Sequence, residues 1–112
     1  MNYIVDFVKS EPTTALDRVL SNFPKINLNK KQLMSLIITA DKINEYLQNN
    51  EIEDGIVGFR EILEWVEMTD YTKNAILAAE YCIIPFSTND EMEKKAVREI
   101  VKTNIAEELI VG

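Results

Sequence analysis

Apolar positions recur at helical spacing along most of the chain. The clearest run lies between residue 29 and about residue 48, where apolar side chains return every three or four positions. This stripe consists of Leu33, Leu36, Ile37, Ala40, Ile43 and Leu47. Asn29 can cap the helix, with Gln32 in the capping-box position three residues later. The pattern therefore predicts a long helix with one buried face.

The same spacing predicts four shorter helices. The first begins near Ser10 and Pro12 and stops at Pro24, because proline interrupts the helical hydrogen bonds. The next begins near residue 57, with Trp65 beside its inward face. A fourth helix ends at Pro85, and a fifth has an acidic first turn. The expected cap of the fourth helix is Asp70 or Thr72, and that of the fifth helix is Ser87, Thr88 or Asn89.

The inward faces of these four helices supply the rest of the predicted core. Its members are Leu16, Val19, Leu20, Phe23, Phe59, Ile62, Leu63, Val66, Ala75, Ile76, Ala78, Ala79, Cys82, Ile83, Val97, Ile100, Val101 and Ile105. The apolar tail LIVG either covers an edge of the core or frays. Residues 3–8, YIVDFV, are β-branched and aromatic and predict one short strand, which needs a pairing partner. An extended tail packed on the helices is the alternative for this segment.

Composition agrees with a helical domain. The 112 residues are 46% hydrophobic and 28% charged, with three glycines and three prolines, so few sharp turns are available. We expect a single all-α domain over residues 1–112: a small five-helix bundle with one short N-terminal strand. The net charge of −7 disfavours general nucleic-acid binding, and no apolar run is long enough to span a bilayer. The single Cys82 allows no intramolecular disulfide and suits the cytoplasm, as a buried, inert thiol.

Several kinds of active site are excluded by missing residues. The chain has no histidine and one cysteine, so histidine bases, catalytic triads and zinc sites cannot form, and we expect no metal. The glycines, Gly55, Gly58 and Gly112, do not match a phosphate loop. Carboxylate pairs at helical spacing, such as Glu61 with Glu64, are expected on solvated faces. No self-contained catalytic site is visible.

The segment EDGIVGFREILEWV departs from the helix rules. Gly55 and Gly58 precede Arg60, whose positive charge on a first helical turn opposes the helix dipole. A guanidinium beside outward-pointing backbone N–H groups is suited to binding a phosphate. The alternative is an ion pair between Arg60 and Glu64, four residues later, on a solvated face. Physical reasoning alone favours the ion pair.

Two stretches, GIVGFREILEWV and AAEYCIIPFSTNDE, resemble the C-terminal helical lid of MoxR-like AAA+ ATPases. The resemblance covers the whole chain and depends mainly on residues 55–60 and 78–90, including Ala78 and Ala79. It implies that residues 1–9 end the last core strand, that residues 10–112 form the lid, and that the chain is a fragment. Arg60 would be the sensor 2 arginine, catalytic in ATP hydrolysis, and Arg60 and Gly58 would contact the nucleotide. The Walker motifs are missing, so ATP and its magnesium would be held by the ATPase core.

The partners implied by this resemblance are the ATPase core, neighbouring ATPase subunits, and a protein substrate or adaptor to be remodelled. The alternative is a free-standing acidic helical module that neutralises a basic protein, with Glu51, Glu53 and Asp54 as contacts. A further alternative is an oligomerisation domain. A phosphate loop encoded upstream of Met1 would favour the lid, whereas a ribosome-binding site directly before Met1 would favour the free module.

Overall fold

The computed structural model describes residues 12–52 and 57–110, and this part of the chain is all-helical. Its α-helices are α2 (Pro12–Asn22), α3 (Lys30–Asn49), α4 (Phe59–Thr72), α5 (Ala75–Cys82), α6 (Ile84–Ser87) and α7 (Glu91–Asn104). A 3₁₀ turn, Glu107–Leu109, follows α7. The all-α class is confirmed, and α6 is one helix more than predicted. The predicted N-terminal strand lies outside the described residues.

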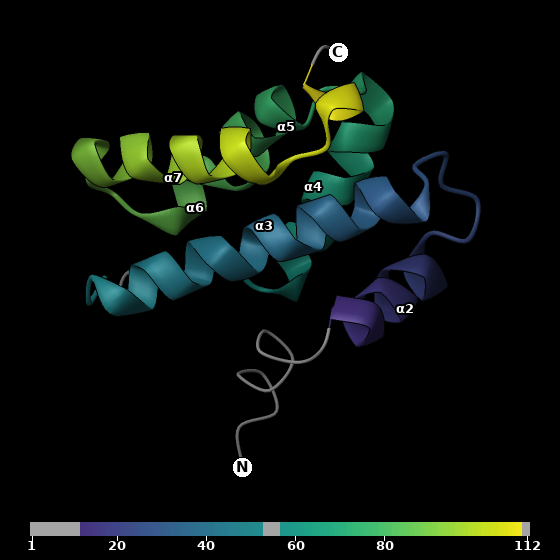
Figure 1. Ribbon diagram of the computed structural model, residues 1–112, viewed down its shortest axis with the longest axis horizontal. Helices are drawn as coiled ribbons and strands as arrows, with labels where there is room; N and C mark the ends of the chain where they lie inside the picture. The colour runs from purple at the N-terminus through teal and green to yellow at the C-terminus, as the bar shows by residue number, and fades with distance from the viewer. Residues whose placement is uncertain (1–11, 53–56, 111–112) are drawn as a thin grey trace.

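The long helix α3 is the centre of the arrangement. Helices α2, α4 and α7 all pack against it, and α5 packs against α4 and α7. Figure 1 shows α7 lying along α3 in the opposite direction, while α4 crosses behind α3. The described residues extend over 37 × 36 × 18 Å. Because packed helix axes are about 8–10 Å apart, the short dimension corresponds to two layers of helices.

Helix α3 forms as its sequence predicts. Asn29 Oδ1 accepts a hydrogen bond from the Gln32 N–H at 2.8 Å, and Gln32 Oε1 accepts one from the Asn29 N–H at 3.0 Å. This is the predicted capping box, which pairs two N–H groups that the helix leaves without partners. All six residues of the predicted stripe are buried. The local sequence was therefore sufficient to define this helix and its inward face.

The boundary between α4 and α5 differs from the prediction. Asn74 caps α5, since its Oδ1 accepts from the Leu77 N–H at 3.0 Å, so neither Asp70 nor Thr72 is the cap. Both of these residues belong to the last turn of α4. Lys73 ends that helix in the left-handed conformation, with φ of 58°, and its N–H donates to the Thr69 carbonyl at 2.7 Å. The left-handed residue turns the chain at once into α5.

The boundary before α7 also differs from the prediction. Asp90 is the cap, because its Oδ1 accepts from the Met92 N–H at 2.8 Å; Ser87, Thr88 and Asn89 do not fill this role. Ser87 ends α6 and Thr88 is its C-cap. Pro85 lies in the first turn of α6, where its missing N–H is harmless, whereas α5 already ends at Cys82. The expected acidic first turn is present as Glu91 and Glu93.

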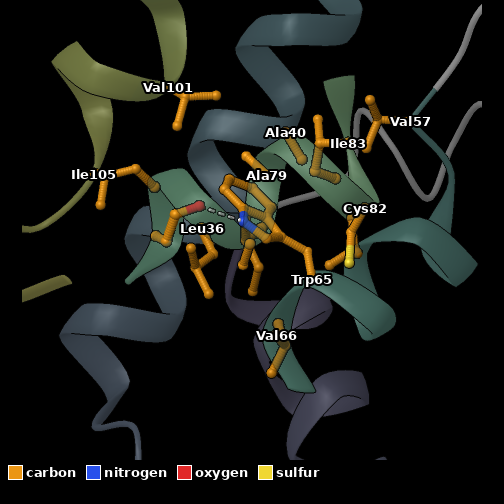
Figure 2. Close-up of a cluster of buried hydrophobic side chains, with 14 of the residues drawn as sticks. Leu36, Ala40, Val57, Trp65, Val66, Ala79, Cys82, Ile83, Val101 and Ile105 are labelled. Carbon is orange, nitrogen blue, oxygen red and sulfur yellow. Dashed lines mark hydrogen bonds between the residues drawn. The ribbon is translucent and has the colours of Figure 1, made fainter. Parts of the chain in front are cut away.

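Trp65 lies in the middle of the core. It has no exposed surface, and its indole Nε1–H donates to the Ala75 carbonyl at 3.0 Å. Figure 2 shows its ring surrounded by side chains from several helices, including Leu36 and Ala79. Trp65 is thus on the buried face of α4 rather than beside it, while Phe59 and Leu63 are only partly buried. Ala79 and the other buried alanines of α5 let that helix approach closely.

Candidate functional site

Arg60 lies on the first turn of α4 and points into solvent. Its side chain is 87% exposed, and its Nε is 3.7 Å from Glu64 Oε1. This is the i,i+4 ion pair that the sequence offered as an alternative to phosphate binding. At such exposure it is worth only a few tenths of a kcal/mol. The ion pair therefore holds the guanidinium weakly.

Gly58 is the N-cap of α4 and already has a partner. Its N–H donates to Glu61 Oε1 at 2.9 Å, and a Cβ added at this position would lie 3.1 Å from the same oxygen. Glu61 therefore neutralises the positive end of α4 and is not simply a solvated carboxylate as expected. Nucleotide binding by Gly58 stays a prediction, and it requires Glu61 to give up this hydrogen bond.

A second arginine reaches the start of α4 from another helix. The guanidinium of Arg18, on α2, lies over the ring of Phe59 with 4.6 Å between its Cζ and the ring centroid. Phe59 is the first residue of α4 and the neighbour of Arg60. A cation over an aromatic face is attracted by the ring quadrupole, so the contact joins α2 to this turn. Arg18 was not predicted from the sequence, because α2 and α4 are far apart in the chain and no local pattern indicates that they meet.

The segment that leads into α4 is held by Asn44. The side-chain amide of this buried α3 residue donates to the Val57 carbonyl and accepts from the Val57 N–H, both at 2.8 Å. Val57 is itself completely buried, so these bonds satisfy both of its backbone groups. They fix the chain one residue before Gly58 and three before Arg60. The sequence signal for this role is the position of Asn44, a polar residue directly after Ile43 of the apolar stripe.

Of the remaining candidates, the structure describes Cys82 and Glu51. Cys82 is buried, and burial, together with the nearby Glu64 and Glu67, raises the pKa of its thiol. This environment disfavours the thiolate and agrees with an inert cysteine. Glu51 is exposed, whereas Glu53, Asp54, Gly55 and Gly112 lie outside the described residues.

The described part of the chain has neither a candidate metal site nor a candidate membrane span. Over residues 12–52 and 57–110, no cluster of three or more Cys, Asp or Glu side chains could hold a metal ion. No helix in these ranges is both long and apolar enough to cross a membrane. What the start of α4 offers chemically is an exposed guanidinium, with a second one nearby, to an anionic ligand brought by another molecule or domain.

Comparisons with protein-family models, curated proteins and solved structures gave no match to this chain. The features that bear on function are therefore the contacts around α4 and the resemblance carried by residues 55–60 and 78–90. Arg60 has a highly exposed side chain on a helical turn, and the backbone before this turn is held by Asn44.

Proposed function

We propose that this chain is the C-terminal lid of a MoxR-like AAA+ ATPase, in which Arg60 contacts the phosphates of ATP bound by the core. The observation that supports this is the state of Arg60: it extends from the first turn of α4, 87% exposed, with Glu64 as its ion-pair partner. Their separation of 3.7 Å is longer than a hydrogen bond, so little free energy opposes a change of partner.

Some of the groups around Arg60 are suited to binding a phosphate, and one of them is already occupied. A guanidinium presents five N–H donors in a planar fork, which matches phosphate oxygens better than an ammonium group does. Arg18 would add positive charge from its position over the ring of Phe59. The Gly58 N–H becomes available only when Glu61 moves away. Arg60 is therefore the primary contact in this proposal and Gly58 a conditional one, while the core would hold the magnesium.

The fold also provides a way to transmit the state of Arg60. Asn44 fixes the segment before α4 through Val57, and Trp65 anchors the middle of α4 in the core. A displacement of Arg60 would therefore move α3 and α5 together with α4. When hydrolysis removes the γ-phosphate contact, the lid would reorient as a unit against the core and the neighbouring subunit. That motion would remodel a protein substrate, in the cytoplasm, where the single Cys82 stays reduced.

The first test is genetic. The proposal requires an ATPase core with a phosphate loop, encoded in frame upstream of Met1. A ribosome-binding site directly before Met1, with no such core, would overturn the lid assignment. That result would favour a free-standing acidic module that neutralises a basic protein.

The second test is kinetic and uses the polypeptide that carries the core. Arg60→Ala should slow ATP hydrolysis by about tenfold or more, since loss of one preorganised donor to a transition-state charge has at least this effect. Lys102→Ala is the matched control, because Lys102 is also exposed and makes a similarly long ion pair, 3.8 Å from Glu99. Equal turnover in the two variants would contradict the proposed role of Arg60.

A further inference from the structure

The solvent-facing side of α4 borders two hollows that share one residue. The first, of about 520 Å³, is lined by Glu64, Glu67, Met68, Tyr71 and Cys82. The second, of about 350 Å³, is lined by residues 22–26 together with Glu67 and Asp70. Glu67 lines both hollows, so they adjoin at this residue. We refer to the two hollows together as the α4 groove.

The α4 groove combines apolar surface with carboxylates. Phe23, Ile26 and Met68 supply partly buried apolar surface, and the ring of Tyr71 is 86% exposed. The ring of Tyr71 is therefore available to a partner, because the core of the domain does not use it. The apolar lining and the free ring provide contact area for the aliphatic side chains of a partner.

The carboxylates of the groove differ in whether they have ionic partners. Glu64 pairs with Arg60, and Asp70 accepts from Lys73 Nζ at 2.8 Å. Glu67 makes no ion pair or hydrogen bond within residues 12–52 and 57–110. It lies at the junction of the hollows, one turn before Tyr71 on α4. Lys25 also lines the second hollow, so the lining of the groove contains three carboxylates and one ammonium group. The lining is therefore negative on balance, and its unpaired Glu67 lies close to an exposed aromatic ring, in a chain of net charge −7.

We propose that the α4 groove binds a segment of a partner protein in which a lysine or arginine is flanked by apolar residues. The cation pairs with Glu67 and packs against the ring of Tyr71, and the flanking side chains enter the two hollows. Charge complementarity selects this occupant over an acidic segment or a nucleic acid. The inference does not depend on the lid function, because the contacts proposed for the cation are Glu67 and Tyr71 and no ATP is involved.

The test measures peptide binding to the isolated chain without nucleotide. The probe is a fluorescein-labelled heptapeptide, Gly-Leu-Ala-Arg-Ala-Leu-Gly, and its analogue has glutamate at the centre. We expect the arginine peptide to bind with a dissociation constant below about 1 mM and the glutamate peptide to bind at least tenfold more weakly. Higher salt should weaken the arginine complex, because partly exposed charge pairs are screened.

Variants then locate the site. Glu67→Gln and Tyr71→Ala should each weaken binding about three- to fivefold, as expected for a partly exposed ion pair and a cation–aromatic contact. Glu45→Gln is the matched control, since Glu45 is an exposed carboxylate on α3 and does not line the groove. Both altered positions are largely exposed, so thermal unfolding followed by circular dichroism should be unchanged. Glu67→Arg should reverse the preference and favour the glutamate peptide.

Three results would overturn the proposal. The first is that the arginine peptide does not bind the wild-type chain at concentrations up to about 1 mM. The second is that the two peptides bind equally well, and the third is that Glu67→Gln and Glu45→Gln have equal effects on binding. Arg60→Ala leaves Glu64, in the lining of the first hollow, without its ion-pair partner, so this variant should bind the arginine peptide at least as well as the wild type. Failure of the groove is therefore distinguishable from failure of the lid function, which is measured by ATP hydrolysis.

Discussion

The two sides of α4 differ in how firmly their polar groups are held. On the buried side, Trp65 donates its indole N–H to a backbone carbonyl at 3.0 Å, within an interior of closely packed side chains. On the solvent side, Arg60 is held by a 3.7 Å ion pair and Glu67 has no such partner in the described residues. Stability is therefore concentrated on one side of the helix, and the chemistry available for binding lies on the other. Substitutions should separate the two sides cleanly.

The largest effect is expected from Asn44→Ala. The change removes both hydrogen bonds to Val57 and leaves a buried N–H and a buried carbonyl without partners. Each unsatisfied group costs about 1–3 kcal/mol, so the free energy of unfolding should fall by about 3–4 kcal/mol in urea titrations. Asn49→Ala, at the exposed end of the same helix, is the control and should change it by less than about 0.5 kcal/mol. A loss below about 1 kcal/mol for Asn44→Ala would show that this anchor is dispensable.

Trp65→Phe should have the next largest effect. Phenylalanine keeps an aromatic ring in the core but removes the hydrogen bond to the Ala75 carbonyl and leaves unfilled volume. We expect a loss of about 2–3 kcal/mol in the free energy of unfolding. Because Trp65 is the single tryptophan, circular dichroism must replace fluorescence as the probe. A loss below about 0.5 kcal/mol would contradict the central role of the indole.

The contact between α3 and α7 should respond to alkaline pH. The Tyr46 hydroxyl donates a hydrogen bond to the Glu93 carboxylate, and this bond raises the pKa of Tyr46 to about 12. A pKa raised in the folded state means that the stabilisation is complete below pH 10, the ordinary tyrosine pKa, and is lost as the pH rises through 12. Below pH 10 the free energy of unfolding of the wild type should exceed that of Tyr46→Phe by about 1 kcal/mol. The difference is modest because the pair is only partly buried.

The measurement compares urea midpoints of the wild type and Tyr46→Phe across this window, so that effects common to both proteins cancel. The difference between them should shrink as the pH rises. A constant difference would mean that Tyr46 contributes through packing and not through its hydroxyl.

The smallest effect should be a gain. The hydroxyl of Thr69, on the buried side of α4, has no hydrogen-bond partner among the residues that the structure describes. Thr69→Val should therefore raise the free energy of unfolding by about 0.5–1 kcal/mol. Thr39 is the matched control: it is equally buried, but its hydroxyl donates to the Ser35 carbonyl at 2.6 Å. Thr39→Val should bring no gain. Similar changes at both positions would contradict the difference in pairing.

The sequence alone determined the helical class, the five longer helices and most of the core, because the signals for them are local. Hydrophobic spacing and capping act over three or four residues, as Asn29 and Gln32 demonstrate. The caps Asn74 and Asp90 were missed because several polar residues compete at each boundary. Which of them caps depends on where the preceding helix stops, and in α4 the left-handed Lys73 decides that point.

The surroundings of α4 were decided by the tertiary structure. Asn44 with Val57, and Arg18 with Phe59, pair residues on different segments, and no periodicity specifies which helix faces will meet. The sequence singled out Arg60 through its conflict with the helix dipole, a local feature. It did not indicate the α4 groove, because that surface exists only once residues 22–26 and Cys82 have been brought beside Glu67.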